Sequence, residues 1–227
     1  DDAADSDAGT NGFTGCYELS SGENETSVDA GLYQTASIGD KVFNDTNANG
    51  IQDQGENGVS GVTVRLFTCV NGQPGVQVGA DTQTDANGNY SFTGLQPGEY
   101  VVQFIAPNGS ILSTANQGVD DAADSDAGTN GFTGCYELSS GENETSVDAG
   151  LYQLASIGDK VFNDTNANGI QDQGENGVAG VTVRLFTCVN GMPGTQVGAD
   201  KQTDANGNYS FTGLQPGEYI VQFVAPN

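Results

Sequence analysis

The chain has 227 residues, of which 35% are hydrophobic and 34 are glycine, a composition that suits small cores joined by many tight turns. Thirty acidic residues against five basic ones give a formal net charge of −25. This charge excludes nucleic-acid binding, because the phosphate backbone would be repelled, and it opposes contact with anionic lipid headgroups. The sequence has no apolar run of membrane length and no export signal, so we expect no membrane insertion and expect any signal or anchor to lie outside these residues.

A repeat of 119 residues organises the chain. Residues 1–108 differ from residues 120–227 at seven positions, so the two stretches are copies of one unit. The phase of the repeat predicts one complete domain between two partial ones. The predicted parts are the C-terminal part of a preceding repeat domain (1–34), a complete domain (35–153) and the N-terminal part of a following repeat domain (154–227). We expect further copies of the same repeat, arranged head to tail, to pair the strand edges that the partial domains would expose.

Short segments with alternating apolar and polar residues predict strands in the complete domain. In chain order these segments are 37–43, 62–67, 89–92, 99–105, 135–138 and 147–152. Val62, Val64 and Leu66 share one face of their strand, and so do Tyr100, Val102 and Phe104. Turn signals such as NG and PG separate the segments, and none of them has a helical period. The sequence therefore predicts an all-β sandwich.

The sharpest motif is DTNANGIQDQGE at residues 45–56, repeated at 164–175. It matches the twelve-residue calcium loop, in which side-chain oxygens alternate along the chain, a glycine permits the sharp turn and a final glutamate binds with both oxygens. The expected ligands are Asp45, Asn47, Asn49, the carbonyl of Ile51, Asp53 and Glu56, and in the second copy Asp164, Asn166, Asn168, the carbonyl of Ile170, Asp172 and Glu175. These hard oxygen donors favour Ca²⁺. The alternative is an Asn- and Gly-rich loop capped by its own side chains.

Two further clusters of acidic and amide side chains are candidate calcium sites, which would give several ions per repeat. TDANGNY offers Asp85 and Asn87, although the same letters form ordinary hairpin turns. DDAADSD, which begins at Asp120, offers Asp124 and Asp126, and its acids would repel one another unless a cation or solvent lies among them. In the other copies the equivalent ligands are Asp204 and Asn206, and Asp5 and Asp7. Asp40 and Asp148 could assist or could be surface residues.

The residues needed for common catalytic sites are missing from the sequence. It has no histidine and only five basic residues, so it lacks the side chains that catalytic triads, phosphate-binding sites and hydrolytic zinc sites require. We therefore expect no enzyme. The four cysteines form no CxxC pair, which argues against a structural zinc site. Even, widely spaced cysteines favour disulfides and hence a secreted or cell-surface location.

The motifs IGDKVFNDTNANGIQDQGENGVSGVTVRLF, TDANGNYSFTGLQPGEYVVQF, DSDAG and VDAGLY occur in an order that resembles the SdrD B-like domain of bacterial surface adhesins. That family belongs to the wider Cna B-type, prealbumin-like group. The resemblance implies tandem Greek-key β-sandwiches, several calcium ions per domain and a stiff spacer between an adhesive head and the cell envelope. It carries the calcium role to Asp45, Asn47, Asn49, Asp53 and Glu56, and more loosely to Asp85, Asp124 and Asp126.

The cysteines are a departure from that family. We expect Cys69 and Cys135, each at or near a strand, to form a disulfide, and Cys16 and Cys188 to pair with neighbouring repeats. Many Cna B-type relatives carry a Lys–Asn isopeptide bond instead. A Lys41–Asp148 version is the alternative, but Gln103 stands where the assisting acid would be expected.

The repetition, the calcium loops and the lack of catalytic residues together favour a structural role. We expect a calcium-stabilised repeat of an extracellular filament or cell-surface stalk that acts as a rigid spacer. The alternative is an adhesive module that binds a host or neighbouring-cell ligand.

Overall fold

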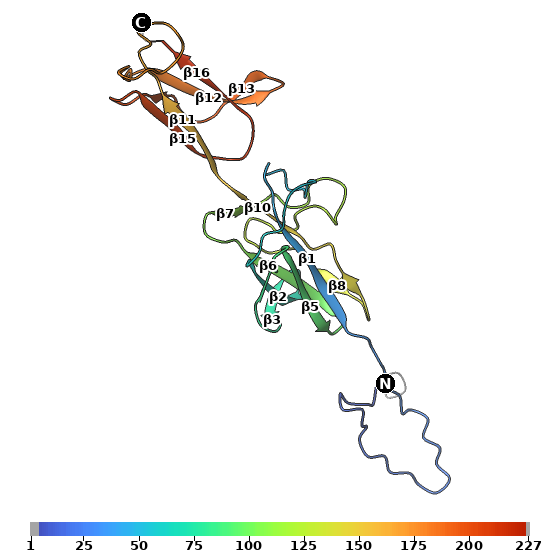
Figure 1. Ribbon diagram of the computed structural model, residues 1–227. Coiled ribbons are helices and arrows are strands. Elements are labelled where there is room, and N and C mark those ends of the chain that lie inside the picture. The colour runs from blue at the N-terminus through green and yellow to red at the C-terminus, as the bar shows by residue number, and fades with distance from the viewer. Residues whose placement is uncertain (1–4, 226–227) are drawn as a thin grey trace.

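The computed structural model describes residues 5–225 (Figure 1). Those residues contain sixteen strands and no helix. We refer to residues 5–34, which hold no strand, as the N-terminal segment, to residues 36–153 as the central unit and to residues 155–225 as the C-terminal unit. The described residues contain no helix that is long and apolar enough to cross a membrane.

The central unit has two five-stranded sheets. In the first sheet the strand order is β5-β1-β10-β7, with β9 paired beside β1. Its strands are β1 (Ala36–Asn44), β5 (Asn89–Leu95), β7 (Ser110–Leu112), β9 (Asn143–Glu144) and β10 (Ala149–Gln153). β1 is antiparallel to β5 but parallel to β10, so the first and last strands of the unit lie side by side.

The second sheet has the order β3-β2-β6-β8, with β4 paired to β2. Its strands are β2 (Thr63–Val70), β3 (Gln73–Gln77), β4 (Thr82–Gln83), β6 (Gly98–Ile105) and β8 (Tyr136–Leu138). The chain crosses between the sheets after β1 and then after each of β4, β5, β6, β7 and β8, so neighbouring strands are often distant in sequence.

A single apolar core lies between the two sheets. Ile38 and Leu151 from the first sheet pack in the same cluster as Leu66, Val102 and Phe104 from the second. The faces predicted for β2 and β6 are buried as expected. The structure therefore confirms the all-β sandwich.

The C-terminal unit repeats part of this architecture. β11 pairs with β15, and β12 pairs with β13, β14 and β16, in the registers of their equivalents in the central unit. The strands are β11 (Ala155–Lys160), β12 (Thr182–Val189), β13 (Met192–Gln196), β14 (Lys201–Gln202), β15 (Asn208–Leu214) and β16 (Tyr219–Val224). Its core of buried residues is smaller and consists of Val183, Leu185, Phe211 and Leu214.

The hairpin formed by β2 and β3 was not predicted. The strand expected over 62–67 continues to Val70 and turns back at Asn71 and Gly72. Both turn residues have positive φ, 53° and 75°, which is the conformation that an Asn-Gly pair favours in two-residue hairpins. The Asn-Gly pair in the sequence could have predicted this hairpin turn.

The disulfide between Cys69 and Cys135 joins the end of β2 to the start of β8, as predicted. Their Cα atoms lie 5.9 Å apart, a normal separation for a disulfide. Cys16 and Cys188 are unpaired within the described part of this chain. Their pairing with neighbouring repeats stays a prediction.

Replacing Cys69 and Cys135 together by serine is expected to lower the free energy of unfolding of the central unit by about 4 kcal/mol, because the disulfide closes a long loop in the unfolded chain. Denaturant unfolding measures this loss. The double variant Cys16→Ser with Cys188→Ser is the control, and it should leave the stability of the central unit unchanged. An equal loss in both double variants would contradict the prediction.

Candidate metal centre

The predicted calcium loop at 45–56 begins directly after β1 and closes on itself. Asp45 is fully buried. Its two carboxylate oxygens accept hydrogen bonds from the backbone N–H groups of Asn49 (3.1 Å) and Gly50 (2.8 Å). At the other end, Glu56 accepts from the N–H and hydroxyl of Thr46 through one oxygen and from the N–H of Asp53 through the other. The first and last acids of the motif therefore tie the two ends of the loop together.

Three side chains in the middle of this loop converge. The amide nitrogens of Asn47 and Asn49 donate to the same oxygen of Asp53, over 2.7 and 2.9 Å. Rotating the two amides by 180° would turn their oxygens toward that point, which is how Asn ligates a cation. The structure thus brings together the central residues of the predicted ligand set.

The loop packs against the acidic segment that follows β7. Ile51 forms a β-bridge with Asp124, the Gln52 N–H donates to the Ala123 carbonyl (2.6 Å), and the Ser125 N–H donates to the Gly50 carbonyl (2.9 Å). The first and third predicted calcium clusters are therefore neighbours in space, although they are far apart in the sequence.

Asp121, Asp124 and Asp126 form an acidic cluster in which one carboxylate oxygen from each residue lies within 4.8 Å of the others. Across residues 5–225 it is the one group of three or more acidic, cysteine or histidine side chains that meets this spacing. Asp124 and Asp126 are each 6% exposed, and one oxygen of Asp124 is buried without a hydrogen-bond partner. Burial raises the pKa of both carboxyls, that of Asp126 to about 6.

Asp148 lies beside this cluster on the way into β10. Its backbone N–H donates to Asp126 (2.6 Å), and one of its own oxygens accepts from the backbone N–H of Lys41 (3.0 Å). The other oxygen is buried without a partner. Burial, and then the nearby Asp40 carboxylate, raise the pKa of Asp148 to about 8.

Sequence reasoning named Asp124 and Asp126 as ligands but did not name Asp121. Its position in the same acidic run could have indicated it. It left the role of Asp148 open between a helper and a surface residue, and the structure buries it. The buried hydroxyl of Ser113, which also lacks a partner, had no signal in the sequence.

The cluster at Asp85 is an exposed turn at the start of the β5 hairpin. One oxygen of Asp85 accepts from the N–H groups of Asn87 and Asn89, and these bonds lower its pKa. Among the described residues, Asp85 belongs to no group of three or more acidic, cysteine or histidine side chains close enough to share a metal ion. The geometry is that of the ordinary turn considered as the alternative, and Asp204 and Asn206 repeat it.

The second copy of the predicted calcium loop keeps its internal hydrogen bonds, but in the described part of the chain no acidic segment lies against it. Asp164 accepts from the N–H groups of Asn168 and Gly169, and Asp172 accepts from both Asn amides, as in the first copy. Asp164 is only half-buried and Ile170 is 61% exposed. The equivalent acids, Asp5 and Asp7, lie in the N-terminal segment, where Asp7 accepts from the Tyr17 hydroxyl and the Asp29 N–H.

A family model described as the SdrD B-like domain matches residues 36–151 and again residues 155–227. This chain belongs to the SdrD B-like domain family. The resemblance seen in the sequence motifs is thereby confirmed, and the SdrD B-like fold accounts for the sandwich of the central unit.

Relatives of this SdrD B-like chain are much longer proteins. It is 40% identical over 203 residues to serine-aspartate repeat-containing protein F of Staphylococcus epidermidis, covering 88% of this chain and 11% of that protein. It is 41% identical over 209 residues to serine-aspartate repeat-containing protein D of Staphylococcus aureus strain Newman, covering 91% of this chain and 15% of that protein. The chain thus spans a small part of the length of these relatives.

Solved structures give weaker likenesses to this SdrD B-like chain. The Bacillus anthracis TIE protein matches with a TM-score of 0.39 and 14% identity, over 85% of this chain and 29% of that one. A streptococcal ancillary pilin matches with a TM-score of 0.38 and 16% identity, over 92% and 60%. Scores this low add no argument to the family assignment.

The packing of the calcium loop can be tested with Gly50. Its φ is +79°, and a Cβ there would lie 2.3 Å from the Thr114 carbonyl oxygen. The equivalent Gly169 has φ +77° and open space around it. We expect Gly169→Ala to destabilise its unit by about 1 kcal/mol through backbone strain, and Gly50→Ala to cost about 2–4 kcal/mol because a clash is added. Hydrogen exchange reports the two units separately. Equal costs would contradict the packing described here.

The raised pKa values predict a pH dependence for the calcium-free protein. In the folded state Asp126 keeps its proton up to about pH 6 and Asp148 keeps its proton up to about pH 8, whereas both carboxyls of the unfolded chain lose their protons near pH 4. Stability should therefore fall as the pH rises through this window. Thermal unfolding in chelator measures the slope, and Asp148→Asn should flatten its upper part. A stability that rises with pH would contradict this assignment.

Proposed function

We propose that this chain is a calcium-stabilised structural repeat of an extracellular filament or cell-surface stalk, and that it acts as a rigid spacer. The observation that carries the proposal is the acidic cluster beside the calcium loop. Asp124 and Asp148 each bury a carboxylate oxygen that has no hydrogen-bond partner. Burying a charged oxygen in this way is costly unless a cation or a proton compensates for it.

Ca²⁺ is the cation that we propose for this place. The surroundings offer carboxylate, amide and carbonyl oxygens, and the described ion pairs place both arginines elsewhere, Arg65 with Asp81 and Arg184 with Asp200. Calcium accepts six to eight oxygen ligands in flexible geometry, so it suits a site assembled from a loop and a separate segment. The proposed ligands are those predicted in 45–56, together with Asp121, Asp124 and Asp126.

The connections between the units support a rigid spacer. β10 ends at Gln153 and β11 begins at Ala155, so a single residue joins the central and C-terminal units. Across this joint the Gln215 amide donates to the Tyr152 hydroxyl (3.3 Å). At the other end, the N–H of Gln34 donates to the Ser140 hydroxyl (2.9 Å). Short, hydrogen-bonded joints leave little freedom for bending.

Membership of the SdrD B-like family supports a cell-surface module, structural or adhesive, rather than an enzyme. We infer an extracellular location, and the disulfide agrees with an oxidising compartment. We also propose the predicted division, in which 35–153 is a complete domain and 1–34 and 154–227 are parts of two others. Further copies of the repeat would then continue the array.

Calcium dependence tests this function directly. Removing calcium with EDTA should lower the melting temperature of the central unit by at least about 10 °C, because each occupied site adds a few kcal/mol to the folded state. Ca²⁺ should restore the transition and Mg²⁺ should not, because Mg²⁺ demands a smaller, more regular shell.

Matched variants locate the effect. Asp124→Asn should reduce the stabilisation by calcium. Asp81→Asn, which removes the same charge from an exposed ion pair, should leave the calcium effect intact. A melting curve that is the same in EDTA and in calcium would refute the proposed function.

A further inference from the structure

The joint between the central and C-terminal units is anchored on both sides. On the central side, Tyr152 is the last residue but one of β10 and is 8% exposed. On the other side, Gln215 directly follows β15, and its carbonyl accepts a hydrogen bond from the Tyr219 hydroxyl (2.8 Å). The Gln215 amide donates to the Tyr152 hydroxyl across the joint (3.3 Å). Each partner in this bond is therefore fixed to its own unit.

The hydrogen bond across the joint does not fix the joint by itself. Its length exceeds that of most N–H···O bonds, so it contributes little free energy. Only Leu154, which is 47% exposed, lies between β10 and β11. The direction of the C-terminal unit therefore depends on how firmly β10 is held in the central unit.

A set of three hydrogen bonds, which we call the clamp, holds the entry into β10 against the acidic segment. The Asp126 N–H donates to the Asp148 carbonyl (2.9 Å), and the Asp148 N–H donates back to the Asp126 carboxylate (2.6 Å). The Gly150 N–H donates to the Ser125 hydroxyl (3.1 Å). The clamp thus joins the end of the acidic segment to the first residues of β10.

The predicted calcium loop reaches the same strand. The N–H of Asp45, the first expected ligand of the loop, donates to the Leu151 carbonyl (2.9 Å). Asp126, an expected ligand in the acidic segment, belongs to the clamp. Expected ligands from the loop and from the acidic segment therefore hold the chain up to the residue before Tyr152.

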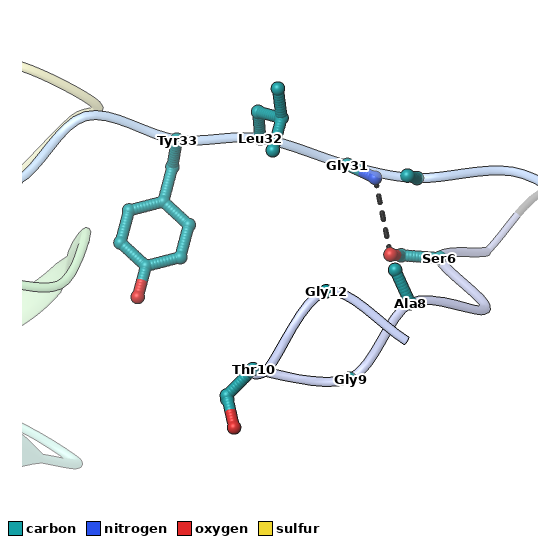
Figure 2. Close-up of a pocket in the computed structure, with 9 residues that line it drawn as sticks. Ser6, Ala8, Gly9, Thr10, Gly12, Gly31, Leu32 and Tyr33 are labelled. Carbon is teal, nitrogen blue, oxygen red and sulfur yellow. Dashed lines mark hydrogen bonds between the residues drawn. The ribbon is translucent and has the colours of Figure 1, made fainter. Parts of the chain in front are cut away.

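The clamp recurs in the N-terminal segment. Asp7 and Asp29 exchange the same two bonds, one from N–H to carbonyl (2.9 Å) and one from N–H to carboxylate (2.7 Å). The Gly31 N–H donates to the Ser6 hydroxyl (3.1 Å). Figure 2 shows this third bond, with Tyr33 farther along the same stretch of chain. The N-terminal segment holds no strand, so the clamp forms without the support of a sheet.

Each clamp is followed closely by a contact with the next unit. Gln34 lies three residues beyond the first clamp, and its N–H donates to the Ser140 hydroxyl of the central unit (2.9 Å). Tyr152 lies two residues beyond the second clamp and accepts from Gln215 of the C-terminal unit. The repeat therefore places a joint directly after each clamp.

The charge of the acidic cluster works against the clamp. Asp121, Asp124 and Asp126 each place a carboxylate oxygen within 4.8 Å of the others, and one oxygen of Asp124 is buried without a partner. Like charges at this spacing repel one another, so without a cation the acidic segment is favoured to move away from β10. A cation bound among these oxygens cancels the repulsion and keeps the clamp in place.

We propose that calcium bound at the acidic cluster fixes the joint that follows the central unit, by holding β10 so that Tyr152 stays on Gln215. Tyr152 is then the positioning residue of the joint, and the direction of the C-terminal unit depends on calcium. This inference rests on the proposed function, because the ion is the one proposed there. It adds a separate effect, in which the ion acts on the angle between two units as well as on the stability of one unit.

Residual dipolar couplings measure how the two units move relative to each other, and the 227-residue chain can be aligned in a neutral stretched gel. In calcium, the couplings of both units should fit one common alignment tensor, because the units move as one body. In EDTA, below the melting transition, the couplings should need two tensors that differ in size by about two-fold or more, because the joint bends on a fast timescale.

Tyr152→Phe and Gln215→Ala test the joint without changing the calcium centre. Each variant removes the same hydrogen bond, so in calcium each should separate the two tensors, and the double variant should add nothing further. The matched control is Gln202→Ala, at an exposed residue of the C-terminal unit. Gln202 pairs with Thr182, at the opposite end of β12 from the partner of Tyr219, so this variant should keep the common tensor.

Asp121→Asn tests the calcium centre in a chain that keeps its joint. Asp121 is the exposed member of the cluster, so the variant should fold, and the loss of one carboxylate should raise the calcium concentration that gives a common tensor by about ten-fold. The matched control Asp81→Asn should need no more calcium than the unchanged chain. This comparison is made in calcium, so it decides the question even for a chain that unfolds in EDTA.

Three results would overturn the inference: a common tensor in both calcium and EDTA, separate tensors in calcium, or a common tensor in Tyr152→Phe and Gln215→Ala. The melting transition in calcium and EDTA, recorded on the same samples, tests the proposed function separately. A melting temperature that depends on calcium, with couplings that do not, would leave the proposed function standing and remove only the inference about the joint.

Discussion

Residues 113–153 hold the central unit together because they contact both of its sheets and the loop that follows β1. β10 pairs with β1 in the first sheet, β8 pairs with β6 in the second, and Cys135 is bonded to Cys69. The same stretch lies against the calcium loop through the bridge between Asp124 and Ile51. In the C-terminal unit, whose described residues lack an equivalent of this stretch, β11 and β16 are shorter than β1 and β6 and the core is smaller, whereas the other strands keep the lengths of their equivalents.

The contact between the loop and the acidic segment concentrates negative charge in a protein that already has a net charge of −25. Apolar side chains at these positions would cost less free energy to bury. Carboxylates in such a position make folding depend on what compensates for them, either protons at low pH or a cation. Under the proposed function, the fold of the spacer becomes sensitive to the calcium concentration outside the cell.

Much of this architecture could be predicted from the sequence. The faces of β2 and β6 followed from alternation, because each strand has one buried side, and the motif from Asp45 to Glu56 predicted a glycine-containing loop directly after the first strand. The position of Asp124 over Ile51 could not be predicted, because the chain between them passes through both sheets. The burial of Asp148 could not be predicted either, because its neighbours in the sequence are as typical of an exposed strand as of a buried one. The local sequence pattern determines where strands and turns form, whereas the environment of a side chain depends on pairing between strands that are distant in the sequence.

The parallel pairing of β1 and β10 has a mechanical consequence. The chain enters the central unit at the start of β1 and leaves it at the end of β10, and these two strands are neighbours running in the same direction. A pulling force on the two ends would therefore load their hydrogen bonds in shear, so that several bonds must break together instead of opening one after another. The disulfide adds a second limit, because the residues between Cys69 and Cys135 cannot be drawn out while it is intact. A string of such units would resist tension along the direction in which a tether is stretched.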